Sequence, residues 1–367
     1  MSNSSSLGKV SPAGPGATTL QVAYAGLRNA GFDRWFIFGI PAVAIVSLAV
    51  VLVWPATFYT VLALDLWLLG YHHVIATYTR IGLDRESRAK YWALFLVLPI
   101  GVIAAVFSIG LAAGAGFLTT IYFYWLWFHY VRQSEGVSKA YAARGGMRDV
   151  ADGALHRISF YLVPTASLLQ VIHAGNGILL GIRIHIPEIP GQVMVGVWVL
   201  AGVVAAASLI RLIMTVRERK ASRLYPAFVV THHLMFIVTY GLVADLSVAW
   251  LGLNVWHNLQ YLTFVWLSHE RRFKGKVSDD AKLLSTLALP RNVWIYVLGC
   301  LAITFACYSG VQGAVSPIGS WLGTSGLLAA VMVYQTINFH HYIVDAVIWR
   351  RPKPESAAPL AHSNVLS

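Results

Sequence analysis

Residues 91–131 read YWALFLVLPIGVIAAVFSIGLAAGAGFLTTIYFYWLWFHYV, a stretch of 41 residues without a single Asp, Glu, Lys or Arg. About 20 apolar residues are enough to cross the hydrocarbon core of a bilayer as a helix. This stretch is twice that length, and its centre, Gly110–Gly116, is rich in glycine. The sequence therefore predicts two membrane-spanning helices, 91–109 and 112–131, joined by a tight hairpin.

The remainder of the chain has the same apolar character. Hydrophobic residues make up 57% of the 367 residues and charged residues only 11%, whereas soluble domains carry about 25% charged residues. Because the backbone in lipid must satisfy its own hydrogen bonds, each apolar run is expected to be a helix. We therefore predict an all-α polytopic transmembrane helix bundle with about ten spans, at 35–55, 57–79, 91–109, 112–131, 157–181, 192–215, 226–249, 253–269, 292–312 and 322–349.

The positions of the cations predict the orientation of the bundle. The chain has 27 Lys and Arg against 15 Asp and Glu, and only Arg183 lies in a loop that follows an odd-numbered span. Since Lys and Arg accumulate on the cytoplasmic side, we expect cytoplasmic tails at 1–33 (disordered) and 351–367 around a transmembrane domain at 34–350, in the inner membrane of a bacterium. The net charge of +12 then reflects topology, and no nucleic-acid partner is expected.

Histidine is frequent in this chain and concentrated at one depth. Ten of the 13 His lie inside or at the ends of predicted spans, namely His72, His73, His129, His173, His232, His233, His257, His269, His340 and His341. With a rise of about 1.5 Å per residue, five of the spans carry His in their cytoplasmic half. His173, about 24 Å from the cytoplasmic end of its span by the same rise, is expected to be a hydrogen-bonded core or interface residue. Ionisable groups inside a membrane are costly and usually functional.

Imidazoles at one depth on five helices allow three interpretations. Several neutral His with open positions suit iron, copper or zinc, two His on facing helices can hold a haem, and polar packing is the third. The metal is favoured because His341 and Asp345 are i,i+4 neighbours on one face, as are His257 and Tyr261. Asp345 can orient an imidazole, ligate directly or pair with Arg350. Tyr261 is a candidate ligand or proton donor, or bonds to a neighbouring His.

Two acidic residues are expected deeper in the membrane. Asp65 precedes His72 by seven residues, which puts it on the same helical face and about 10 Å deeper. Asp245 lies deeper still in its span. Each is interpreted either as the acid of a proton relay or as a structural partner of His173 or a Tyr.

In their order along the chain, these motifs resemble the Brp/Blh family of bacterial and archaeal membrane proteins, which cleave β-carotene to retinal with a His-ligated non-haem iron. The P-H-G, H-F-G, H-x-x-x-H and P-H-x-x-x-x-D motifs of that family correspond to His73 in YHHV, His129 in FHY, His257 in HNLQY, and His340 with Asp345 in HHYIVD. No Pro precedes His73, and Tyr261 replaces the second His of H-x-x-x-H. The resemblance then implies that the fourth ligand comes from Tyr261, His269, His233 or His341.

These observations predict a metal centre in the cytoplasmic half of the bundle. The expected ligands are His73, His129, His257 and His340, with His72, His233 and His341 as further candidates, and Tyr261 and Asp345 as candidate catalytic residues. The implied function is an oxidoreductase that uses non-haem iron and O₂ on a lipid-soluble isoprenoid, carotenoid or acyl chain, surrounded by membrane lipids. The alternatives are a metal- or proton-coupled transporter, which needs polar groups on both sides of the midplane, and a b-haem electron-transfer subunit.

Overall fold

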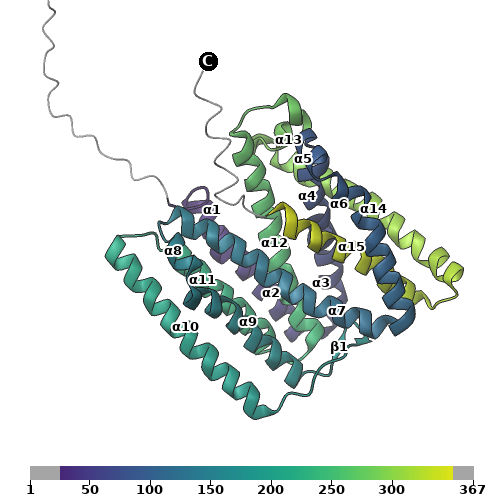
Figure 1. The fold of residues 1–367 in the computed structure, drawn as a ribbon, viewed down its shortest axis with the longest axis horizontal. Helices are drawn as coiled ribbons and strands as arrows, with labels where there is room; N and C mark the ends of the chain where they lie inside the picture. The colour runs from purple at the N-terminus through teal and green to yellow at the C-terminus, as the bar shows by residue number, and fades with distance from the viewer. Residues whose placement is uncertain (1–24, 350–367) are drawn as a thin grey trace, which may run out of the picture.

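The computed structural model describes residues 25–349, which are helical apart from one short β-hairpin. The α-helices are α1 (Ala30–Arg34), α2 (Ile40–Val53), α3 (Phe58–Leu64), α4 (Tyr71–Gly82), α5 (Arg85–Lys90), α6 (Trp92–Leu96), α7 (Leu98–Arg144), α8 (Arg148–Asp152), α9 (Ala154–Ala174), α10 (Gly191–Arg219), α11 (Leu224–Phe236), α12 (Leu246–Phe273), α13 (Lys282–Leu287), α14 (Val293–Leu322) and α15 (Gly326–Ile348). The hairpin strands are β1 (Ile178–Leu179) and β2 (Ile182–Arg183), which pair antiparallel. Figure 1 shows α10 at one edge of the bundle and α14 at the other, with α4, α7, α12 and α15 between them.

Within residues 25–349, six helical segments are long and apolar enough to cross a membrane, so the chain is a helical membrane protein. They are Ala30–Val53, Pro55–Gly82, Trp92–Arg144, Gly191–Arg219, Leu224–Gly241 and Pro290–Leu322. Helix α12, which is not one of these segments, carries more polar residues. In α12 nearly every side chain between Leu246 and Tyr261 is buried, including His257 and Asn258. Polar groups therefore face the interior of the bundle, where other side chains satisfy them.

The 91–131 stretch forms the kinked helix α7 and the short α6 before it. Gly114 interrupts α7 with a non-helical backbone (φ 79°, ψ 177°), a left-handed conformation that favours glycine. The chain changes direction there (Figure 1). The break lies within the predicted Gly110–Gly116 hairpin, so the two predicted spans correspond to the two arms of one interrupted helix.

Among the described residues, three segments are wider, π-helical turns: η1 (Trp35–Gly39), η3 (Asp65–Gly70) and η4 (Ile237–Gly241). The 3₁₀ turns are η2 (Pro55–Thr57), η5 (Asp279–Ala281) and η6 (Pro290–Asn292). In η3 the Tyr71 N–H bonds to the Leu66 carbonyl, five residues back. Such a turn holds one residue more than an α-helical turn. Asp65, expected on the face of His72, is therefore shifted toward the face of His73.

The folded chain begins before residue 33, where the sequence analysis ended the disordered tail. Leu27 and Asp33 are buried, and the Asp33 carboxylate accepts hydrogen bonds from the Leu27 N–H at 3.1 Å and the Tyr141 hydroxyl at 2.7 Å. The predicted disordered tail is therefore too long, because the buried Asp33 carboxylate fixes the segment from Leu27 to Asp33 against α7. Residues 1–24 and the predicted tail at 351–367 lie outside the described residues.

An ion pair ties the end of α12 to the loop after α4. Arg272 Nη2 lies 2.9 Å from Asp84 Oδ2, and the Ser87 N–H also donates to this oxygen at 3.1 Å. Burial opposes the ionisation of Asp84, but the hydrogen bonds from Ser87 and Arg272 outweigh it and hold the pKa of the carboxyl below its ordinary value. Two of the helices that carry candidate site residues are thus fixed relative to each other.

Candidate metal centre

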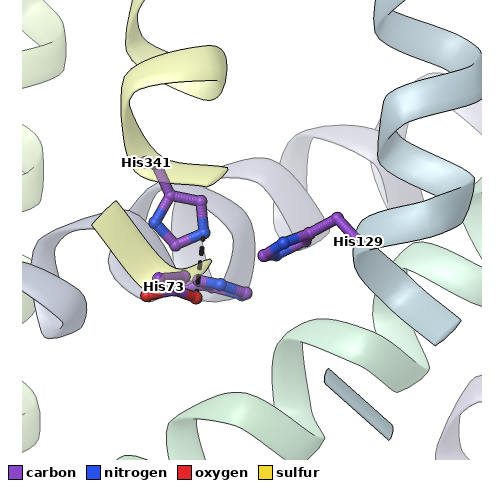
Figure 2. Close-up of side chains that lie close together, drawn as sticks. His73, His129 and His341 are labelled. Atoms are coloured by element: carbon purple, nitrogen blue, oxygen red, sulfur yellow. Dashed lines mark ion pairs between the residues drawn. The ribbon is translucent and has the colours of Figure 1, made fainter. Parts of the chain in front are cut away.

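Three helices bring imidazoles together at the centre of the bundle. His73 on α4, His129 on α7 and His341 on α15 direct their rings toward one another (Figure 2). With Asp345, one turn after His341, they form a buried group whose ligand atoms all lie within 4.8 Å of one another. Metal–nitrogen bonds are about 2.0–2.1 Å long, so donors on opposite sides of one ion lie about 4 Å apart. Small side-chain adjustments would bring these four donors onto a single ion.

The ring nitrogens at the centre lack hydrogen-bond partners. Among residues 25–349 none is found for the buried Nε2 atoms of His73, His129 and His341. A buried polar atom without a partner costs free energy unless something absent from the chain satisfies it. Three such atoms converging from three helices fit a metal ion, which accepts lone pairs from neutral imidazoles.

A fourth imidazole, that of His257 on α12, lies against this group. Its ring centroid is 4.8 Å from that of His73 and 5.1 Å from that of His129, and its buried Nδ1 has no partner among the described residues. Tyr130 stacks on the opposite side at 4.0 Å. His257 is therefore placed to complete the ligand set or to border an open position.

Hydrogen bonds orient His341 and Asp345 from behind. The Tyr261 hydroxyl donates to Asp345 Oδ1 at 2.6 Å, and Asp345 Oδ2 lies 3.6 Å from His341 Nε2, the approach drawn dashed in Figure 2. Thr77 Oγ1 is 2.7 Å from the Tyr261 hydroxyl and 3.1 Å from His341 Nδ1. If Thr77 donates to Tyr261 it accepts from Nδ1–H, which leaves the Nε2 lone pair of His341 facing the centre.

Tyr261 also contacts the group through its ring. The ring stacks on His73 at 3.9 Å with an interplanar angle of 2°. The hydroxyl is bonded to Asp345 and Thr77, so Tyr261 supports the group from the side and does not bond to a neighbouring His. Tyr261 was predicted from the sequence because a Tyr four residues after His257 lies on the same helical face.

Three of the predicted ligands lie away from the group. His340 uses both ring nitrogens elsewhere, with Nδ1 against the Tyr78 hydroxyl and Nε2 2.8 Å from the Leu94 carbonyl. His72 Nδ1 bonds to the Leu68 carbonyl at 3.2 Å. His233 lies on α11 next to His232 and Phe160, and none of the ring contacts found for it among residues 25–349 is to the central group.

The remaining candidate for a fourth ligand, His269, and the two deep acids have other partners. His269 Nε2 is 3.4 Å from Thr79 Oγ1 and packs against Tyr296. Asp245 accepts from the Val248 N–H at 2.9 Å and caps α12, and Asp65 bonds to Asn254 and Asn258. Arg350, the alternative partner of Asp345, lies outside the described residues. Thr77 and Asn258 were not predicted from the sequence. The signals available for them were the position of Thr77 four residues after His73 and that of Asn258 in the HNLQY segment.

A cavity opens from the central group toward the β-hairpin. It has a volume of about 270 Å³, and its wall includes His73, His257 and His341 at the group and Leu179 and Ile182 at the hairpin. Aromatic side chains form much of the remaining wall: Tyr71, Tyr122, Tyr130, Trp250, Tyr308, Tyr334 and Tyr342. An uncharged wall of this kind accepts an apolar molecule next to the ligand atoms.

Comparison of the chain with known protein families, characterised proteins and solved structures finds no significant match.

Proposed function

We propose that the protein is a membrane-embedded oxidoreductase that holds a non-haem iron and uses O₂ on a lipid-soluble substrate. The observation that carries the proposal is the convergence of the ring nitrogens of His73, His129 and His341, which lack hydrogen-bond partners among the described residues. They lie beside an uncharged cavity whose wall includes His73 and His341. Asp345 supplies a carboxylate within the same 4.8 Å group. Nitrogen and carboxylate donors with open positions are the ligand type of non-haem iron oxygenases.

Each neighbouring residue of the group has a role in this proposal. A bound iron would supply the activation of O₂. The chain itself orients the ligands, through Thr77 on His341 and Tyr261 on Asp345. The burial of the ligand side chains and the aromatic wall of the cavity limit the access of water, which protects an oxidising centre from side reactions.

The close approach of the rings favours an ion over a haem. The ring centroids of His73 and His341 are 4.7 Å apart, and those of His129 and His341 are 5.3 Å apart. A macrocycle held between two His needs a flat gap around its iron, and neighbouring imidazoles occupy the space here. An isoprenoid, carotenoid or acyl chain is proposed for the cavity on its aromatic and aliphatic wall, in keeping with the resemblance to the Brp/Blh family.

The proposed topology has ten spans with both termini in the cytoplasm of a bacterium, in its inner membrane. The two arms of the Trp92–Arg144 segment and the other five apolar segments give seven. The helices α9, α12 and α15, of 21, 28 and 23 residues, are long enough to supply the other three. The distribution of Lys and Arg supports the orientation.

Metal analysis of the detergent-purified protein tests this function. We expect about one iron per chain, an optical spectrum without a Soret band, and a lower melting temperature after chelation, because an ion that binds only the folded chain stabilises it. His129→Ala should abolish iron binding, and His173→Ala, whose native ring is exposed and bonded to the Ile189 carbonyl, should retain it. A stable wild-type preparation that holds no iron after expression in iron-rich medium would contradict the proposal.

A further inference from the structure

Asp65 is a carboxylate buried in the bundle without a cation. Its side chain is 2% exposed, and no Lys or Arg among residues 25–349 forms an ion pair with it. Its partners are two amides of α12: Asn254 Nδ2 donates to Oδ2, and Asn258 Nδ2 donates to Oδ1 at 3.2 Å. A carboxylate in a low-dielectric interior is costly unless nearby positive charge compensates it.

The amide of Asn258 links Asp65 to the central group. An ionised carboxylate only accepts hydrogen bonds, so Asp65 bonds to the NH₂ group of the Asn258 amide. The amide oxygen Oδ1 of Asn258 then faces away from Asp65. Asn258 Oδ1 lies 3.0 Å from His73 Nδ1. His73 must then carry its proton on Nδ1, which leaves the lone pair of Nε2 facing His129 and His341.

A parallel link runs through Asn254 to the fourth imidazole. The Tyr130 hydroxyl donates to Asn254 Oδ1, and the Tyr130 ring stacks on His257 at 4.0 Å with an interplanar angle of 30°. The Asp65 carboxylate thus orients the amides of both Asn254 and Asn258. Asn258 bonds to His73 directly, and Asn254 contacts His257 through Tyr130. The π turn η3 is what shifts Asp65 toward the face of α4 that carries His73.

We propose that Asp65 is a positioning residue that fixes the ligand tautomer of His73 through Asn258 and provides the second negative charge for a divalent cation. The inference rests on the proposed metal site. A divalent ion bound by neutral imidazoles and Asp345 retains one positive charge, and Asp65 neutralises it from beyond the ligands. Carboxylates behind a ligating His have this role in other metal sites, where their loss lowers metal affinity about 10–100-fold.

Asp65→Asn tests the inference by placing an amide where the carboxylate was. With an NH₂ group beside it, Asn258 is free to turn its own NH₂ toward His73, which favours the wrong tautomer. We expect the affinity of the apo-protein for Co²⁺, measured from the visible ligand-field spectrum with a competing chelator, to fall about 10–100-fold. The exchanged pair Asp65→Asn/Asn258→Asp restores a carboxylate acceptor for His73 Nδ1–H and should recover at least half of the loss on a logarithmic scale.

Asp33→Asn is the matched control, because it removes another fully buried carboxylate that accepts from a Tyr hydroxyl and a backbone N–H, far along the chain from the ligands. It should leave Co²⁺ affinity unchanged whatever it does to thermal stability. Should Asp65→Asn not fold, Asn258→Ala takes its place, since it leaves Asp65 bonded to Asn254 and cuts the link to His73.

The outcomes separate the two proposals. A wild-type protein that binds neither Co²⁺ nor Fe²⁺ overturns the metal site itself. Wild-type binding with unchanged affinity in Asp65→Asn, or in Asn258→Ala where that variant is used, overturns only the role of Asp65. Loss of affinity that the exchanged pair does not recover also overturns it, because the proposal requires a carboxylate behind His73 and not one particular shape.

Discussion

His340 and His341 are adjacent on α15 and have different surroundings. Successive residues of an α-helix point about 100° apart, so only one member of an HH pair can face a given centre. His341 Nε2 faces the group without a hydrogen-bond partner among the described residues, whereas His340 is bonded at both nitrogens, to Tyr78 and Leu94. His340 therefore has the contacts of a structural residue that ties α15 to α4 and α6.

Replacing these neighbours one at a time gives a test within a single turn of helix. His341→Ala should reduce bound metal to the level of His129→Ala, because it removes one of three converging donors. His340→Ala should keep the metal and lower the melting temperature, since it removes the hydrogen bond to the half-buried Leu94 carbonyl, which contributes about 0.5–1.5 kcal/mol. Metal content and thermal unfolding of both variants are measured in the same detergent. The reverse pattern would make His340 the ligand, as the motif order along the sequence predicts.

The sequence carried part of this site and not the rest. Depth along the spans and i,i+4 spacing singled out His73, His129, His341 and Asp345, because helical rise and periodicity are fixed by local geometry. Which member of each HH pair faces inward depends on the rotation of its helix about its own axis. That rotation is set by packing and, before α4, by the π turn η3. No local sequence pattern predicts this turn.

At the scale of elements, the cavity depends on the close contact of the second arm of α7 with the β-hairpin. A Cβ at Gly116 would lie 2.7 Å from the carbonyl oxygen of Arg183 on β2. On the same face, Thr120 Oγ1 accepts from the His185 N–H at 2.8 Å. Glycine at this position lets the helix approach backbone directly and holds the hairpin across the end of the cavity.

Gly116→Ala should therefore destabilise the protein, by about 1–3 kcal/mol as for other overpacked contacts. Gly136→Ala is the matched control on the same helix, because its Cβ meets nothing within 4 Å, and alanine in an exposed helical position is favoured by about 0.5–1 kcal/mol. Thermal unfolding in detergent should thus move in opposite directions for the two variants. Equal melting temperatures would mean that the hairpin is not held against α7.

Hydropathy predicts some of the membrane-spanning helices well and others less well. Outer segments such as Gly191–Arg219 contain a long apolar stretch and are found by hydropathy. The inner helices α12 and α15 carry the site, so their polar residues lower the apolar signal that hydropathy detects. The kink in α7 was predictable because its glycines are visible in the sequence; the wide turns were not, because they arise from packing.

At the scale of the whole molecule, charge asymmetry and site position are connected. The cations lie in the segments that connect one set of helix ends, and the His layer was expected near that side. The cavity, in contrast, leads from the His group to the β-hairpin, which belongs to the connection that contains Arg183. In the proposed topology, the proposed apolar ligand would reach the proposed metal site from the side opposite to the cytoplasm, or laterally from the lipid near that side.

Two exposed glutamates at the ends of α10 test this orientation. Glu188 precedes the helix and Glu218 lies in its last turn; each is replaced by Cys in a background in which Cys300 and Cys307 are Ser. If the termini are cytoplasmic, a membrane-impermeant maleimide added to intact spheroplasts should label Glu188→Cys at once and Glu218→Cys only after lysis, because α10 separates them by its full 29 residues, about 43 Å. Labelling of Glu218→Cys alone in intact spheroplasts would mean that the orientation is the opposite of the proposed one and that the cavity opens toward the cytoplasm. Labelling of both in intact spheroplasts would mean that α10 does not cross the membrane, since the two positions would then share one aqueous compartment.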